Sequence, residues 1–380
     1  MRILIAAPVP RSREGGAAGV VYNLAEELER LGHSVDSWFL EDVAGGLQLP
    51  GRFATVNFAV KVAARIVREK RKYSVVNIHA PCGFAYGFLH KVLRLRGTPP
   101  YVMTMHGLEE RRTYVMSREA KKGRAWYFRF RNRLWHRFYH RPAYRLSIQT
   151  ADRAIVLNRE AWSCLQLKYK RDAQDVWYVP NGVEKRFFLE RRYSGQELPR
   201  LLYVGTWLDH KGVFYLRDAF QSLAQKWPGL RLTVAGCMGA ADRVKDFFDP
   251  VVRGQIDVIP FVSAADMPEV YARHDIFVFP SLVEGMPLVL LEAMATGMPV
   301  VTTETCGMAD IVQDDVNGLL VPPADSEALV RALSRLLESA GERARLGQAA
   351  QQAMKHHTWE RAAGRVESVL LLALRQNGKR

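Results

Sequence analysis

Short apolar runs alternate along the chain with longer segments in which apolar residues recur at helical spacing. Near the start, Gly15-Gly16 precedes an amphipathic helix predicted at Val20–Leu31, which Gly32 closes. Strands buried on both faces and separated by helices are typical of a parallel sheet covered by helices. The predicted strands of this half are Arg2–Ala7, His33–Leu40, Tyr73–His79, Tyr101–His106 and Asp152–Leu157.

The same pattern restarts after Pro180-Asn181-Gly182 and the polar connection Glu184–Arg200. A last amphipathic helix is predicted at Thr358–Gln376, with Thr358 as its N-cap. We therefore expect an α/β protein with two Rossmann-like doubly wound domains, residues 1–184 and 185–357, facing each other across a ligand-binding cleft. The predicted strands of the second half are Leu201–Val204, Leu230–Ala235, Ile256–Ile259, Ile276–Phe279, Val300–Thr302 and Gly318–Val321.

Length and composition exclude several other classes of protein. With 380 residues, 48% of them hydrophobic and 24% charged, the chain is long enough for two cores and is neither disordered nor fibrous. Four widely spaced cysteines without a C-x-x-C pair suggest neither a disulfide framework nor a zinc site. This cysteine usage fits a reducing cytosol, and no apolar run is long enough for a signal-peptide core or a membrane span, so we expect a cytoplasmic location.

The positive charge is concentrated in one part of the chain. Residues 51–150 hold 22 Lys and Arg against 4 Asp and Glu, whereas residues 201–380 hold 18 against 21. Residues 111–145 alone contain twelve Lys and Arg, one acid and nine aromatic residues. Such a basic, aromatic segment could bind an anionic membrane surface. It could also bind a nucleic acid, or be a solvated basic face with its aromatic side chains in the core.

The most informative stretch is Phe279–Val301, FPSLVEGMPLVLLEAMATGMPVV. A strand ends at Pro280, Gly285 allows a tight turn, and Pro287 stands where a helix would begin, since its missing N–H costs nothing there. The N–H groups of that helix end form an anion site suited to a diphosphate. Glu284 and Glu292 are eight residues apart, so they are not an adjacent catalytic pair. Each carboxylate could accept two hydroxyl hydrogen bonds, from a hexose at Glu284 and from a ribose at Glu292.

This stretch resembles the two-glutamate signature of family 4 retaining glycosyltransferases with the GT-B fold, the glycosyl transferases group 1. Other segments occur in the order of that family and extend the resemblance over nearly the whole chain. They are Gly15-Gly16, similar to the N-terminal glycine loop; Thr104–Gly107, with His106 at a strand end; Val179–Val183, similar to the end of the first domain; and Leu202–Gly212, similar to the first strand and turn of the nucleotide-binding domain.

The resemblance implies roles for individual residues. His106 and Glu284 would be catalytic, with His106 beside the donor sugar, and Glu292 would bind the nucleoside. The helix at residues 358–380 would cross back onto the first domain, and retention would proceed by front-face attack. The donor diphosphate would be bound by Gly15, Gly16, Gly205, Thr206, Lys211, Gly285, Met286, Pro287 and Leu288.

Two positions depart from the family pattern. Thr206 stands where the family has an arginine next to the diphosphate, and a hydroxyl cannot replace a bidentate guanidinium. Another cation, or Lys211 together with helix N–H groups, would then hold the phosphates, unless the donor is unusual. Asp310 replaces a frequent glutamate, which is a small change.

The expected function is retaining transfer of a hexosyl group from a nucleoside-diphosphate sugar, most simply of UDP or GDP. The acceptor would be an anionic glycan or lipid-linked glycan of cell-surface polysaccharide, lipopolysaccharide or glycolipid synthesis. Residues 111–145 would hold the first domain at the inner face of the plasma membrane, without nucleic acid. No D-x-D motif or cluster with metal-binding spacing is apparent, so we expect neither a metal nor a cofactor. The alternatives are an epimerase-type enzyme and a basic membrane- or nucleic-acid-binding protein with a degenerate donor site.

Overall fold

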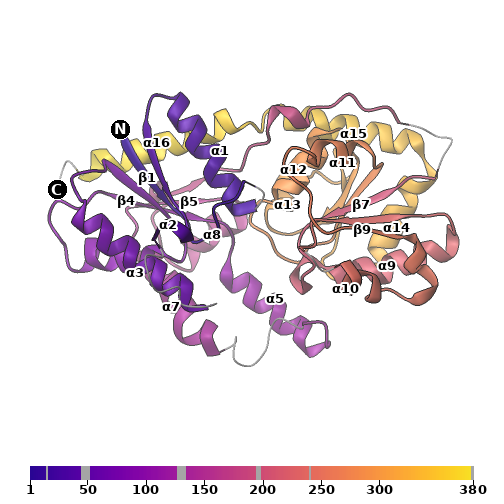
Figure 1. Ribbon diagram of the computed structural model, residues 1–380, viewed down its shortest axis with the longest axis horizontal. Coiled ribbons are helices and arrows are strands. Elements are labelled where there is room, and N and C mark those ends of the chain that lie inside the picture. Colours follow the sequence, from indigo (N-terminus) through magenta and orange to yellow (C-terminus); the bar gives the residue numbers. More distant parts are fainter. Residues whose placement is uncertain (14–15, 44–51, 126–133, 194–197, 239–240, 378–380) are drawn as a thin grey trace. The chain divides into compact units, whose positions relative to one another are not determined.

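The computed structural model describes residues 1–13, 16–43, 52–125, 134–193, 198–238 and 241–377 (Figure 1). The chain divides into two compact units. The first combines Met1–Glu110, Arg129–Gly182 and Trp359–Arg380, and the second combines Arg111–Phe128 and Val183–Thr358. In the described part of the chain, no helix is both long and apolar enough to cross a lipid bilayer.

The first unit contains a six-stranded parallel sheet in the order β2-β1-β3-β4-β5-β6. The order reverses between β1 and β3, the place where doubly wound sheets bind ligands at the carboxyl ends of their strands. Strands β1, β3, β4 and β5 are mainly apolar, and all their residues except Arg2 are buried, as expected for strands covered on both faces. The strands are β1 (Arg2–Ala6), β2 (Ser34–Trp38), β3 (Val75–His79), β4 (Tyr101–Met105), β5 (Arg153–Val156) and β6 (Val176–Tyr178).

Helices cover this sheet, and they include the last helix of the chain. Helices α1 and α16 pack together, and α16 contacts β3, β4 and β5 (Figure 1). Side chains of α3, α4 and α7 form a core with the sheet, including Phe58, Tyr86 and Ile148. The helices are α1 (Gly16–Arg30), α2 (Leu40–Val43), α3 (Arg52–Arg68), α4 (Gly83–Gly87), η1 (Phe88–Val92), η2 (His136–His140), α7 (Arg141–Thr150), α8 (Arg159–Leu167), η3 (Ala173–Asp175) and α16 (Trp359–Asn377).

The second unit has its own six-stranded parallel sheet, in the order β12-β11-β10-β7-β8-β9. This is the strand order of a dinucleotide-binding Rossmann sheet, and it reverses between β7 and β10. The loops that follow these two strands therefore border the expected ligand position. The strands are β7 (Leu201–Val204), β8 (Leu232–Ala235), β9 (Ile256–Ile259), β10 (Ile276–Phe279), β11 (Val300–Thr303) and β12 (Leu319–Val321).

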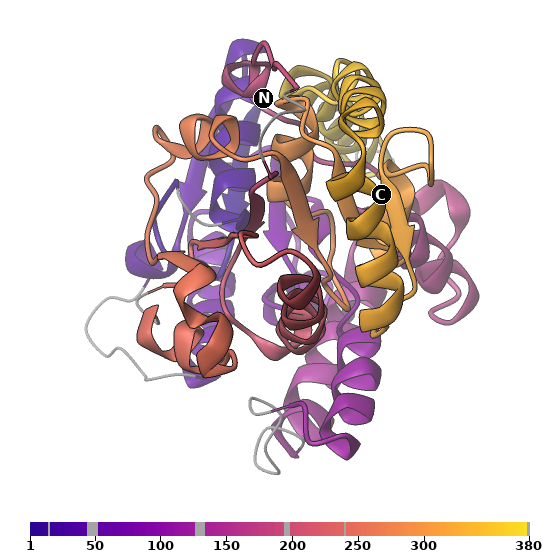
Figure 2. The ribbon, with the colours of Figure 1, turned by 90° about the vertical axis from the view of Figure 1, so that its right-hand side faces the viewer.

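Helices of the second unit pack in pairs against its sheet. Helix α9 lies beside α14, and α12 lies beside α15 (Figure 2). Helix α14 has a strongly amphipathic pattern and buries Leu329, Leu333 and Leu336. The helices are η4 (Lys185–Phe187), η5 (Asp209–Lys211), α9 (Val213–Lys226), α10 (Ala241–Asp246), η6 (Pro250–Gln255), α11 (Met267–Ala272), α12 (Leu288–Ala295), α13 (Cys306–Ile311), α14 (Ser326–Glu338) and α15 (Ala340–Met354).

The α/β class and the doubly wound sheets agree with the sequence prediction, and each predicted strand is present. The prediction missed β6, a three-residue strand. It also placed residues 111–145 entirely in the first domain, whereas Arg111–Phe128, most of α5 (Glu109–Lys121) included, groups with the second unit. The physical reason is a set of contacts with α9: Tyr215 Oη donates to Glu119 Oε2 at 2.6 Å, and Arg124 pairs with Asp218 at 3.1 Å.

Candidate active site

The loops after β7 and β10 bring a cation and a carboxylate together at the reversal point of the second sheet. Lys211 Nζ lies 2.5 Å from Glu284 Oε1, and Ser281 Oγ donates to the same oxygen at 2.8 Å. The side chains of Lys211 and Glu284 are only 18% and 12% exposed. Both charges are thus largely shielded from water, at the position where doubly wound sheets bind their ligands.

The turn that carries Lys211 depends on a glycine. Gly212 adopts φ +75°, and a Cβ atom on it would lie 1.9 Å from the carbonyl oxygen of Pro280. Only glycine allows the start of α9 to approach the end of β10 this closely. The backbone contact therefore fixes the distance between the loop of Lys211 and the loop of Glu284. Gly205, at the end of β7, also has a positive φ, of +146°.

The turn Gly285–Pro287 leads into helix α12. Pro287 is the N-cap and Leu288 the first helical residue, one position later than predicted. The first-turn N–H groups of a helix have no intrahelical partner and attract anions. The turn is supported from α13, because a Cβ atom on Gly307 would lie 2.1 Å from the carbonyl oxygen of Gly285. Close backbone packing thus holds the predicted diphosphate-binding turn in place.

Glu292 lies in the middle of α12 and faces a buried tyrosine. Tyr271 Oη donates to Glu292 Oε2 at 2.9 Å. Burial raises the pKa of Glu292 to about 7, and the hydrogen bond from Tyr271 offsets only part of this effect. Part of the Glu292 population is therefore protonated at neutral pH. A ligand that donates hydroxyl hydrogen bonds would favour the ionised form.

Two arginines of α5 belong to the surroundings of this site, and the sequence analysis did not identify them. Arg111 Nη2 donates to Thr305 Oγ1 at 3.1 Å, and Thr305 directly precedes α13. The charge of Arg112 adds to the effect of burial in lowering the pKa of His210, the neighbour of Lys211. No sequence signal could have found these arginines, because each is about a hundred residues or more from the residue it meets.

In the first unit, His106 directly follows β4 and meets the last residue of β3. His106 Nε2 lies 2.8 Å from His79 Nδ1, so one imidazole donates to the other. Burial lowers the pKa of His106 to about 4, and burial together with His106 lowers the pKa of His79 well below its usual value. Both rings are therefore neutral at pH 7. Gly16 begins α1, and Gly15 lies outside the described residues.

The basic, aromatic segment 111–145 is divided by residues 126–133, which lie outside the described residues. Before this gap, Arg111 and Arg124 hydrogen-bond within the second unit. After it, Tyr139 packs edge-on against Phe84 in the first unit. Other side chains face solvent, with Phe138 71% exposed. The segment therefore combines structural contacts with exposed positions.

A further cluster corrects the prediction that no group of residues has metal-binding spacing. Glu109, His136 and His140 each offer one ligand atom, and these atoms all lie within 4.8 Å of one another. His136 and His140 are four residues apart, which is a metal-binding spacing on a helix. The sequence analysis overlooked this pair, and its third member is 27 residues away from His136.

Two family models match the chain in succession. Residues 14–187 match Glycosyltransferase Family 4, and residues 186–353 match Glycosyl transferases group 1. A D-inositol 3-phosphate glycosyltransferase of Salinispora tropica is 35% identical over 347 residues, which cover 83% of this chain and 68% of the relative. The chain spans about half to two thirds of the length of the first curated relatives that it matches, from 46% to 68%.

Solved structures show the same fold. Sucrose-phosphate synthase of Thermosynechococcus elongatus superposes with a TM-score of 0.81 at 21% identity, over 98% of this chain and 100% of that chain. HepE of Anabaena, in complex with UDP-glucose, superposes with a TM-score of 0.70 at 17% identity, over 97% and 99% of the two chains. The two parallel sheets and these neighbours establish the GT-B fold.

Proposed function

The chain belongs to the glycosyl transferases group 1 family, and we propose that it moves a hexosyl group, with retention, from a nucleoside-diphosphate sugar to a glycan or lipid-linked acceptor. The observation that carries this proposal is the contact of Lys211 with Glu284 at the reversal point of the second sheet. A nucleotide-sugar donor needs a cation for its phosphate and a carboxylate for its sugar hydroxyls at the same place. Both are present and both are largely shielded from water.

The donor diphosphate would lie between Lys211 and the N-terminus of α12. Departure of the nucleoside diphosphate from the sugar C1 develops negative charge on the β-phosphate. Preorganised donors that meet this charge supply most of the catalytic stabilisation in such reactions. The Lys211 ammonium and the N–H groups of the Gly285–Leu288 turn are placed to do so.

Arg111 and Arg112 supply the positive charge that Thr206 lacks. Arg111 hydrogen-bonds to Thr305 beside α13, and Gly307 of α13 packs on the Gly285 turn. The charge of Arg112 helps to lower the pKa of His210, which is next to Lys211 in the sequence. A guanidinium can contact a diphosphate with two parallel hydrogen bonds, as the absent arginine would. The positive charge would then come from α5 rather than from the end of β7.

Glu284 would accept hydrogen bonds from the hexose, and Glu292 from the ribose of the nucleoside. Oε1 of Glu284 is already bonded to Lys211 and Ser281, so a hexose hydroxyl that binds this oxygen would replace one of these contacts. UDP is the donor nucleotide that the comparisons favour, since HepE of Anabaena was solved with UDP-glucose. His106, neutral at pH 7, would donate or accept a hydrogen bond with a sugar hydroxyl rather than form a covalent intermediate.

The proposal includes an acceptor at an anionic membrane surface. Leu134 and Phe138 are 42% and 71% exposed, and the Arg137 guanidinium lies 5.9 Å from the centroid of the Phe138 ring. Apolar side chains flanked by arginines suit the boundary between headgroups and acyl chains. Residues 88–96 of the same unit also contain Arg94 and Arg96, and they expose Phe88, Val92, Leu93 and Leu95.

Flotation with liposomes tests the membrane part of the proposal. We expect the protein to float with anionic but not with neutral vesicles. The double variant Leu134→Ser and Phe138→Ser should bind at least tenfold more weakly, because a buried phenylalanine alone contributes about 1.5–3 kcal/mol. Phe261→Ser, at a 56% exposed position of the second unit, is the matched control and should bind like the wild type. If the protein floated with neither kind of vesicle, a soluble acceptor would remain.

Thermal stabilisation by nucleotides tests the donor part. UDP, GDP and ADP, each with its sugars, are compared at concentrations that span the dissociation constant. A ligand at about 100 times its dissociation constant adds about 2.7 kcal/mol to the free energy of unfolding. One nucleotide series should shift the melting temperature clearly. If none does so, the donor site is lost and the proposal fails.

A further inference from the structure

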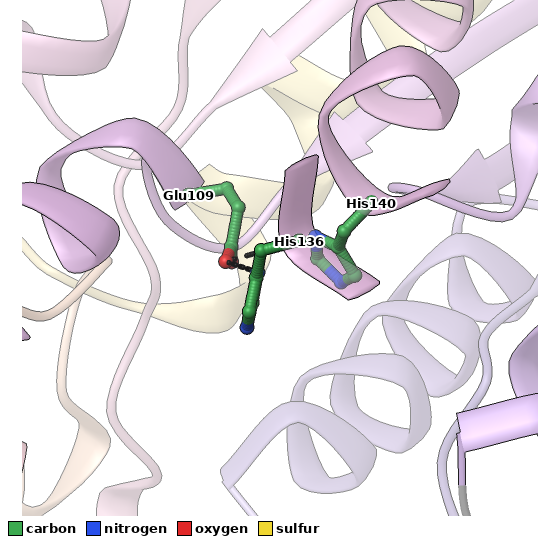
Figure 3. A group of neighbouring side chains, drawn as sticks. All are labelled: Glu109, His136 and His140. Atoms are coloured by element: carbon green, nitrogen blue, oxygen red, sulfur yellow. Dashed lines mark ion pairs between the residues drawn. The ribbon is translucent and has the colours of Figure 1, made fainter. Parts of the chain in front are cut away.

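We propose that Glu109, His136 and His140 bind a divalent transition-metal ion, and that this ion is Zn²⁺. Glu109 Oε1 lies 2.7 Å from His136 Nδ1 and 3.7 Å from His140 Nδ1 (Figure 3). The three ligand atoms converge within 4.8 Å of one another. None of the three is among the residues proposed to bind the donor.

Two elements present these side chains, and all three residues belong to the first unit. His136 and His140 are the first and last residues of the π-helical segment η2, and their rings lie 4.9 Å apart between centroids. Glu109 is the first residue of α5, and only Gly107 and Leu108 separate it from His106. The two histidines therefore approach the carboxylate from one helix (Figure 3).

The donor set matches the preference of zinc. Two imidazole nitrogens and one carboxylate oxygen are a common three-ligand set for Zn²⁺, with a water in the fourth position. Ligand bonds of about 2.0–2.2 Å place tetrahedral ligand atoms roughly 3.4 Å apart. The distances of 2.7 Å and 3.7 Å from Glu109 Oε1 lie on either side of this value, so side-chain rotations of modest size would complete the geometry.

The surroundings also suit a bound ion. The Glu109 side chain is 7% exposed, and those of His136 and His140 are 18% and 20% exposed. A nearly buried carboxylate attracts a cation strongly, and the two histidines are partly exposed to solvent. An ion bound at both Nδ1 atoms would replace the contacts that these atoms now make with Glu109 Oε1.

Binding would join two positions that are distant in the sequence. Glu109 and His136 flank residues 110–135, the greater part of the basic, aromatic segment. An ion that ligates both would hold Glu109 and His136 together, and it would fix the residues just after His106. Because the folded protein alone offers the assembled site, the ion would stabilise the fold.

Titration of the metal-free, untagged protein with Zn²⁺ tests the proposal. We expect one equivalent to bind and to raise the melting temperature, with reversal by a chelator. Glu109→Gln, His136→Gln and His140→Gln should each weaken binding at least tenfold. His356→Gln, at an exposed histidine of the second unit, should bind like the wild type. A wild type without one-to-one binding, or three variants that bind like the control, would overturn the proposal.

A second measurement does not depend on how the variants fold. X-ray absorption of the wild-type protein with one equivalent of Zn²⁺ should show a nitrogen and oxygen shell that includes two imidazoles. A shell without imidazole, or one with sulfur, would exclude this site. Because neither measurement uses glycosyl transfer, the metal proposal and the proposed function can fail independently.

Discussion

Lys211 and Glu284 contact each other directly, with 2.5 Å between Nζ and Oε1, although they follow different strands of the second sheet. The pair compensates two charges that are largely removed from water, which would be costly if either stood alone. A donor that inserts its phosphate at Lys211 and its sugar at Glu284 must replace this contact with its own. The ion pair of Lys211 and Glu284 thus keeps both side chains in place until the substrate replaces it with contacts of its own.

Lys211→Ala should lower kcat by a factor of about 10²–10³, the usual cost of removing one donor that stabilises developing oxyanion charge. Ser281 would remain bonded to Glu284, but the carboxylate would lose its cation, so the variant should also be less stable and its folded fraction is checked before the assay. Steady-state release of nucleoside diphosphate measures the effect. Lys226→Ala, which removes an exposed lysine paired with Glu338, is the control and should keep full activity. Equal activity of the two variants would remove Lys211 from the phosphate site.

Donor binding should strengthen with pH, because ribose hydroxyls favour ionised Glu292, whose pKa is about 7 in the free protein. Between pH 6 and pH 8 the affinity should rise about tenfold. Calorimetry with a nucleotide sugar is the suitable measurement, since its diphosphate lacks the terminal phosphate group that titrates near pH 6.

Glu292→Gln should flatten this pH dependence.

In the absence of ligand, the raised pKa of Glu292 means that the folded state binds the proton more tightly than the unfolded state does. The stabilisation from Glu292 is therefore complete below about pH 4.5 and is lost as the pH rises through 7. A wild-type affinity that does not change with pH would contradict the role of Glu292.

Gly212→Ala should destabilise the protein by more than about 2 kcal/mol, because φ is +75° and the new Cβ would meet the Pro280 carbonyl oxygen at 1.9 Å. Gly364→Ala, in the middle of α16 with open space around it, should instead stabilise by up to about 1 kcal/mol. Denaturant unfolding of the two variants provides the comparison. If both changed stability alike, the turn would not depend on its glycine.

Arg111→Ala should weaken binding of the nucleotide sugar about tenfold, since a charge-assisted hydrogen bond contributes about 1.5–3 kcal/mol. Arg118→Ala, on the same helix, is the matched control, because Arg118 is exposed and bonds only weakly, at 3.5 Å, to Tyr114. Calorimetric dissociation constants decide the question. An unchanged constant for Arg111→Ala would mean that the absent arginine at position 206 is not replaced from α5.

Most helices and strands could be predicted from the sequence, because the periods of apolar residues that indicate them are local properties. Every strand with a long apolar run was predicted, and β6 was missed because Val176–Tyr178 is too short to show a period. Helix α16 was predicted at its correct place for the same reason. The reversal point between β7 and β10 depends on strand order, which no local pattern encodes.

The site was only partly predictable. The sequence pattern indicated Glu284 and Glu292, and the family resemblance added Lys211, but neither indicated that Lys211 and Glu284 are paired. Tyr271, which bonds Glu292, carries no motif of its own. Arg111 and the Glu109 cluster depend on contacts over long sequence distances, so only the fold brings them together.

Release of nucleoside diphosphate from UDP-, GDP- and ADP-sugars, followed with and without candidate glycan acceptors, tests the central claim most directly. The account predicts release from one nucleotide series, abolished in Glu284→Ala and retained in Glu338→Ala, whose carboxylate is 55% exposed and remote in sequence from Glu284. Release from no donor, or undiminished release by Glu284→Ala, would contradict it.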